Sequence, residues 1–80
     1  MTRKEMKEAA IELIHAALED LENVNDDYLE EKSDINLRCV GMATNRVCTV
    51  LLVYRSVGLI TEEENADFFS EMQEINRREE

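Results

Sequence analysis

The sequence contains no proline and no tryptophan, and glycine occurs only at Gly41 and Gly58 among its 80 residues. Proline and glycine mark most turns, and the chain also lacks the Asn-Gly and Asp-Gly pairs that typify β-hairpins. An all-β fold of short strands therefore has little support. Hydrophobic residues make up 44% of the chain and charged residues 35%, a balance that favours a folded all-α domain over a disordered segment.

Positive charge is also scarce, because nine Lys and Arg residues stand against nineteen Asp and Glu residues and leave a net charge of −10. Such a surface repels nucleic acid and anionic membranes over a screening length of ~8 Å. The longest fully apolar run, Val50 to Val53, is too short to span a bilayer, and no apolar segment follows Arg3 and Lys4 to form a signal peptide. We expect a cytoplasmic protein that binds neither nucleic acid nor membranes directly.

Three amphipathic segments predict one acidic domain over residues 1–80, folded as a small three-helix bundle. The first helix is expected over about 3–22, because Thr2 and Glu5 form a capping box and apolar residues then recur every three or four positions. Asn and Asp residues interrupt this pattern, so 23–33 is expected to be an acidic loop or a short turn. Leu29 is in phase with the next helix, which leaves open that 26–33 extend it.

The second helix is expected over about 34–57, with Ser33 or Asp34 as its N-cap and Gly58 just past its end. Its apolar residues form a main face and a flanking stripe, which suits a long central helix packed against two neighbours. The main face comprises Val40, Ala43, Val47, Val50, Leu51, Tyr54 and Val57, and the flanking stripe comprises Ile35, Cys39, Met42 and Val53. The third helix is expected over about 62–77, where Thr61 and Glu64 form a second capping box.

Carboxylates are concentrated in two places where they do not favour stability. Seven lie between residues 19 and 31 with no basic residue among them, and negative charge at a helix C-terminus opposes the macrodipole. Two more, on the third helix, have no basic residue at helical spacing. The predicted partner-binding residues are Glu19, Asp20, Glu22, Asp26, Asp27, Glu30, Glu31, Asp67 and Glu71. Complementary charge speeds encounter with a basic protein surface, whereas the simpler interpretation is a surface that only keeps the protein soluble.

One face of the second helix carries mostly small residues and is the predicted surface for self-association. It comprises Gly41, Asn45, Cys48 and Leu52, where another helix could approach closely and would cover a leucine otherwise left in water. Arg46 interrupts the flanking stripe, so we expect it to be partly buried and paired with an acid of the third helix. The alternative role of Arg46 is to contact a ligand in an oligomer.

No residue pattern predicts a metal site or a cofactor. An EF-hand frame beginning at Asp20 lacks a ligand at Val24 and the turn glycine at Asn25. Glu12 and His15 form a single Glu-x-x-His step, of which di-iron bundles use two.

The two cysteines do not predict catalysis. Cys39 and Cys48 lie nine positions apart, on opposite faces of one helix and ~13 Å apart along it, so they are expected to be free, reduced thiols. His15 is the only histidine that could activate either thiol. We therefore expect no enzyme activity.

Together these patterns predict a non-enzymatic module whose carboxylates occupy the basic surface of a nucleic-acid-binding protein or toxin. Inhibitors that mimic nucleic acid, and acidic antitoxins, share this size and charge, which is an analogy and not a shared motif. One alternative is a helical homo-oligomer that binds a small anionic ligand between subunits, with Arg38, Arg46 or Arg55 supplying its positive contacts. Another is a structural or assembly subunit.

Overall fold

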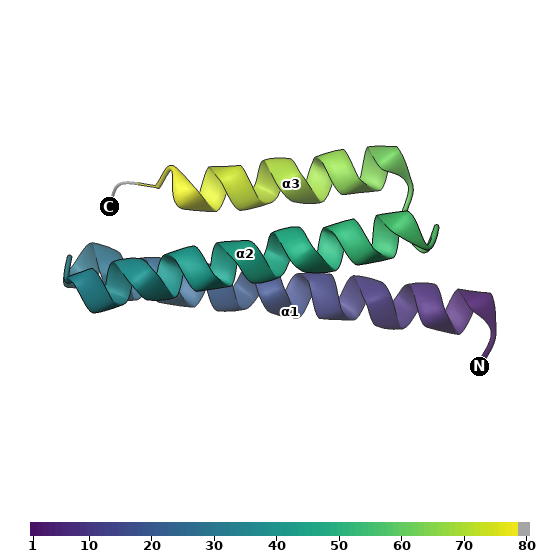
Figure 1. The fold of residues 1–80 in the computed structure, drawn as a ribbon, viewed down its shortest axis with the longest axis horizontal. Coiled ribbons are helices and arrows are strands. Elements are labelled where there is room, and N and C mark those ends of the chain that lie inside the picture. The colour runs from purple at the N-terminus through teal and green to yellow at the C-terminus, as the bar shows by residue number, and fades with distance from the viewer. Residues whose placement is uncertain (79–80) are drawn as a thin grey trace.

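The computed structural model describes residues 1–78 and contains three helices in that range, joined by two short connections. α1 runs over Arg3–Glu30, α2 over Asp34–Ser56 and α3 over Glu62–Asn76. The helices run up, down and up along an elongated molecule of 43 × 22 × 16 Å (Figure 1). The all-α, three-helix prediction is confirmed for this part of the chain. None of the described helices is both long enough and apolar enough to cross a membrane.

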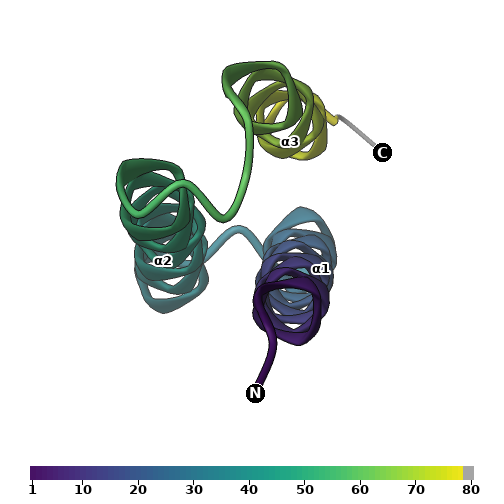
Figure 2. The ribbon, with the colours of Figure 1, turned by 90° about the vertical axis from the view of Figure 1, so that its right-hand side faces the viewer.

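The helices are arranged as a triangle, with α3 lying over one side of the α1–α2 pair (Figure 2). Each helix packs against the other two, and the contact between α1 and α2 is the most extensive. α1 is the longest helix and contributes the largest share of the buried side chains. The structure therefore does not single out α2 as a central helix.

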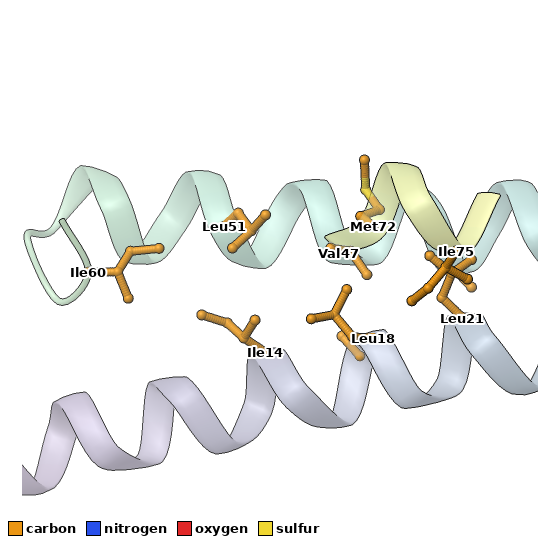
Figure 3. Packing of buried hydrophobic residues seen from close by; sticks show 10 residues of the cluster. Ile14, Leu18, Leu21, Val47, Leu51, Ile60, Met72 and Ile75 are labelled. Atoms are coloured by element: carbon orange, nitrogen blue, oxygen red, sulfur yellow. The ribbon is translucent and has the colours of Figure 1, made fainter. Parts of the chain in front are cut away.

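The core is a row of aliphatic side chains that meet along the axis of this triangle (Figure 3). Ile14 and Leu21 of α1 and Val47 of α2 are completely enclosed. Full burial of a large aliphatic side chain contributes about 1.5–3 kcal/mol to folding. The other members of the cluster are Ala17, Leu18, Ala43, Leu51, Ile60, Met72 and Ile75.

The first helix continues well beyond its predicted end, and the prediction of an acidic loop over 23–33 is wrong. Residues 23–30 are helical, and only 31–33 separate α1 from α2. Asn and Asp lower helix stability by less than about 0.7 kcal/mol each, which burial of neighbouring residues offsets. Val24 packs against the core, and Asn25 is only 4% exposed, so the core-facing side of α1 extends through this stretch. Residues 26–30 therefore extend the first helix and not the second.

Side chains from other helices supply hydrogen bonds at two helix ends. The Asn25 amide donates to the carbonyl of Ile75 at 3.0 Å, near the end of α3. The Asn36 amide, in the first turn of α2, donates to the carbonyl of Glu31 at 2.8 Å, just past the end of α1. Carbonyls at helix C-termini have no partner within their own helix, so these amides tie neighbouring helices together.

The predicted helix starts are confirmed. Thr2 with Glu5 and Thr61 with Glu64 each form both hydrogen bonds of a capping box. Ser33 is the N-cap of α2, and its hydroxyl accepts a hydrogen bond from the backbone of the third helical residue.

The predicted glycine stop after α2 is also confirmed. Gly58 has φ +75°, the left-handed conformation that glycine adopts without strain. The Leu59 N–H donates to the Tyr54 carbonyl at 2.9 Å and the Gly58 N–H to the Arg55 carbonyl at 3.1 Å, which is the Schellman pattern.

The flanking stripe of α2 is not buried, contrary to expectation. Ile35, Met42 and Val53 are 72%, 66% and 49% exposed, and Cys39 is also exposed. α1 and α3 cover only the side of α2 centred on Val47, and the stripe lies on the far side of the α1 contact. A sequence pattern records which residues share a face but not how many neighbours the helix has.

Candidate functional site: an acidic groove between α1 and α3

An open groove of about 380 Å³ runs between α1 and α3. Its base is apolar, with Leu18 and Ile75 from the core. Its walls are acidic, with Glu19 and Glu22 on α1 and Glu71 on α3. His15 and Asn23 complete the lining. The fold thus brings carboxylates from the two predicted acidic patches, about 50 positions apart in the chain, to one groove.

The acidic side of α1 follows from helical geometry. At 100° per residue, carboxylates spaced by four, seven, seven and four positions fall within a narrow sector of the helix surface. That sector lies opposite the core-facing residues, and all of its carboxylates are exposed. They are Glu8, Glu12, Glu19, Asp26 and Glu30.

On α3, Glu71 is the acid that reaches the groove, and Asp67 lies one turn before it. Both side chains are exposed. Neither forms an ion pair with any residue in 1–78, and the same is true of Glu19 on the opposite wall. These carboxylates are therefore accessible to positive charge from outside the chain.

Two of the predicted acidic residues are already paired. Glu22 accepts a hydrogen bond from Arg78 in a salt bridge, which links α1 to the end of α3 and raises the pKa of the arginine. Asp20 lies 2.8 Å from Arg46 of α2. A charge pair at an exposed position contributes little to stability, but it reduces the net negative charge that the carboxylate offers to a basic partner.

The structure divides the remaining predicted residues between two sides of α1. Asp26 and Glu30 continue the acidic sector that borders the groove, toward the C-terminal end of the helix. Asp27 and Glu31 are exposed but lie away from the groove, on the side of Asp20. The predicted patch between residues 19 and 31 is therefore not one surface, because it continues around a helix.

His15 and Asn23 are polar groove residues that were not among the predicted contacts. The ring of His15 meets Phe68 of α3 edge to face, with ring centroids 5.5 Å apart. The sequence signal was its position one turn before Glu19, beside the apolar stripe of the first helix. Only the packing of α3 shows that this places it in a groove.

The ion-pair partner and the exposure of Arg46 both differ from what the sequence predicted. Its side chain is 61% exposed and pairs with Asp20 of α1, not with an acid of α3. Arg46 lies between Met42 and Val53 of the flanking stripe, which points away from α3 and past the edge of α1. The predicted pairing with α3 is therefore wrong.

The predicted self-association face remains partly open. Gly41, Asn45 and Leu52 are exposed, but the sulfur of Cys48 lies 3.6 Å from that of Met72 on α3. Cys48 is thus half-buried against the bundle, while both it and Cys39 are free thiols. Leu52 and Phe69 lie together in a shallow groove between α2 and α3.

Among residues 1–78, no three His, Cys, Asp or Glu side chains gather in a geometry that could hold a metal ion. Comparisons with protein families, with characterised proteins and with solved structures gave no match.

Proposed function

We propose that the protein is a binding module whose acidic groove between α1 and α3 occupies a basic surface of another protein. The observation that supports this most directly is that Glu19 and Glu71, from separate helices, line one groove without an ion pair within the described residues. A nucleic-acid-binding protein, or a toxin that acts on nucleic acid, presents the complementary surface, because its binding surface must attract phosphates.

Electrostatics also favour this choice of partner over a small ligand. Like charges that line one groove repel each other, and a basic partner relieves that repulsion when it binds. Of the three arginines predicted as contacts for an anionic ligand, Arg46 is paired with Asp20 and Arg55 with Glu62, while Arg38 forms no ion pair among residues 1–78. The small-ligand oligomer thus has less support than the charged binding module.

The proposal can be tested by affinity capture with two charge-reversed variants of equal net charge. The groove variant carries Glu19→Lys and Glu71→Lys, and the control carries Asp27→Lys and Glu31→Lys on the other side of α1. A basic partner bound at low salt is expected to be lost by the groove variant, retained by the control and released from the wild type at high salt.

Equal retention of that partner by both variants would show that the acidic groove is not the contact surface. Equal loss from both would show that net charge alone holds the partner. Circular dichroism of each variant would establish that the four reversed positions, all exposed, leave the fold intact.

A further inference from the structure

The side of the α1–α2 pair away from α3 carries a concentrated set of exposed apolar side chains. Among residues 1–78, six of the ten large hydrophobic residues that remain exposed belong to it. We call this surface the open face. Its apolar members are Met6 and Leu13 of α1 and Ile35, Met42, Val53 and Val57 at or next to α2.

The spacing of these residues is that of a helix–helix seam. Met6, Leu13 and Asp20 follow one another at intervals of seven along α1. On α2, positions 35, 39, 42, 46, 49 and 53 alternate at intervals of four and three, the spacing by which one helix packs along another. Four of these positions are the flanking stripe, and the other two are the polar residues Arg46 and Thr49. Figure 2 shows that α3 lies on the opposite side of the pair, so no described helix covers this seam.

The Asp20–Arg46 ion pair lies within the open face. Together with Leu13 and Val50 it lines a shallow groove between α1 and α2. Arg46 is near the middle of α2, which runs over Asp34–Ser56. A surface with one acid and one base side by side near its centre is complementary to its own two-fold-related copy, because each Asp20 can then meet an Arg46 of the partner.

Most of the remaining negative charge lies away from this face, and the exception is Asp27, one interval of seven beyond Asp20 toward the end of α1. The acidic sector of α1 and the groove with α3 lie on other sides of the molecule, so neither faces the second copy. Repulsion between two chains of charge −10 is screened over ~8 Å, which weakens it between these outward-facing surfaces. A basic partner, by contrast, would be attracted more strongly to the acidic groove than to the open face, whose centre carries one acid and one base.

From this geometry we infer that the open face is the interface of a homodimer, in which two copies pack their α1–α2 pairs against each other around a two-fold axis. The six apolar side chains of each copy are then removed from water, which extends a core that is small in a chain of 80 residues. The dimer leaves both acidic grooves accessible, so the inference does not depend on the proposed function.

The first experiment compares two adjacent substitutions by analytical ultracentrifugation. Val53→Lys places a charge in the open face, and Leu52→Lys places the same charge on the neighbouring face of α2, at a residue of similar exposure (54% against 49%). The wild type and Leu52→Lys are expected to sediment as dimers and Val53→Lys as a monomer, although the added lysine lowers the net negative charge.

Three results would overturn the inference. The first is a wild type that sediments as a monomer at high micromolar concentration. The second is a dimer that survives Val53→Lys but not Leu52→Lys, which would place the interface on the face of Gly41 and Asn45. The third is loss of the dimer in both variants while circular dichroism shows both folded.

The second experiment tests the two-fold pairing itself. Asp20→Arg and Arg46→Asp should each weaken the dimer, because like charges then meet across the axis. When the two variants are mixed, a face with two arginines meets a face with two aspartates, and a heterodimer should form. Mixed variants that remain monomeric would overturn the two-fold arrangement.

Discussion

At the scale of single residues, the polar groups of this protein act mainly at helix ends. Asn25 is the buried polar side chain among residues 1–78, and it supplies a hydrogen bond to the end of α3. The side chain of Glu64, in the first turn of α3, accepts two hydrogen bonds. Its carboxylate accepts from Thr61 N–H at 2.9 Å and from the Lys7 ammonium at 2.7 Å. Each of these contacts joins positions that are distant in sequence or closes a helix end.

Replacement of Asn25 by alanine is expected to lower the free energy of unfolding by about 1–3 kcal/mol, because it removes a buried donor from a helix-end carbonyl. Urea unfolding followed by circular dichroism measures the change. The control is Asn23→Ala, an exposed asparagine on the same helix, which should be neutral or slightly stabilising since alanine favours helix. Equal effects at the two positions would mean that the hydrogen bond from the Asn25 amide to the Ile75 carbonyl does not contribute to stability.

Glu64 predicts a specific pH dependence. The hydrogen bond from Lys7, and then that from the Thr61 backbone, lower the pKa of Glu64 in the folded state. A carboxylate with a lowered folded pKa contributes stability above its unfolded pKa and loses that contribution as the pH falls through the folded pKa. Glu64→Gln should therefore be less stable than the wild type at neutral pH, and the difference should vanish in acid.

The measurement is the melting temperature of both proteins across a pH series that starts at neutrality. Glu63→Gln, an exposed neighbour in the same helical turn, is the control and should differ less from the wild type at neutral pH. A constant difference between Glu64→Gln and the wild type at every pH would rule out this contribution from the carboxylate.

At the scale of helices, the unfavourable negative charge at the end of α1 comes from different residues than the sequence predicted, because the helix ends at Glu30. The last turn of α1 contains no basic residue, and Asp26, Asp27 and Glu30 all lie within the helix. Negative charge there opposes the macrodipole, whereas in a loop it would have had little effect. α2 shows the reverse arrangement, because it has Asp34 in its first turn and Arg55 in its last.

Glu30→Lys is expected to raise the free energy of unfolding by about 0.3–1 kcal/mol, because a cation replaces an anion in the last turn of α1. Glu30→Gln should give an intermediate value, and high salt should reduce both gains. Denaturant unfolding at low and high salt checks the order. If glutamine and lysine act alike, the effect is one of helix propensity and not of charge.

The two glycines should respond to alanine with opposite signs. At Gly41, inside α2, an added Cβ would meet nothing within 4 Å, so Gly41→Ala should stabilise the protein by about 0.5–1 kcal/mol. At Gly58, with φ +75°, alanine should destabilise it by about 1–2 kcal/mol. Thermal unfolding of both variants tests the pair, and a stabilising Gly58→Ala would contradict the left-handed helix end.

At the scale of the whole molecule, repulsion outweighs attraction. Residues 1–78 contain four salt bridges, all between exposed or partly exposed side chains, while the chain as a whole has nineteen acidic residues and nine basic ones. Exposed ion pairs contribute at most about 1 kcal/mol each, and salt screens them along with the repulsion. The compact state of so acidic a chain is thus opposed by its own charge.

Added sodium chloride is therefore expected to raise the melting temperature of the protein. The increase should be smaller for a variant with Asp26→Lys and Glu30→Lys, in which part of the repulsion is already removed. Calorimetry at low and moderate salt measures both. A melting temperature that falls with salt would show that the ion pairs, and not the repulsion, dominate.

Several features could be predicted from the sequence because they depend on nearby residues. The all-α class follows from composition and periodicity, and the helix starts at Thr2, Ser33 and Thr61 follow from a side chain and a backbone amide three positions apart. The end of α2 follows from Gly58 in the same way. The acidic residues of the groove were also identified, although as two separate patches.

Only the tertiary structure decided where α1 ends and which faces of the helices are covered. Asn25 interrupts the apolar pattern of the first helix, yet its side chain is buried and donates to the carbonyl of Ile75 in α3. This buried hydrogen bond outweighs the low helix propensity of asparagine. The pairing of Arg46 with Asp20, the placement of Glu19 and Glu71 along one groove and the exposure of Val53 all depend on the positions of other helices. Periodicity shows which residues share a face, but the partner of that face is a property of packing between segments far apart in the chain.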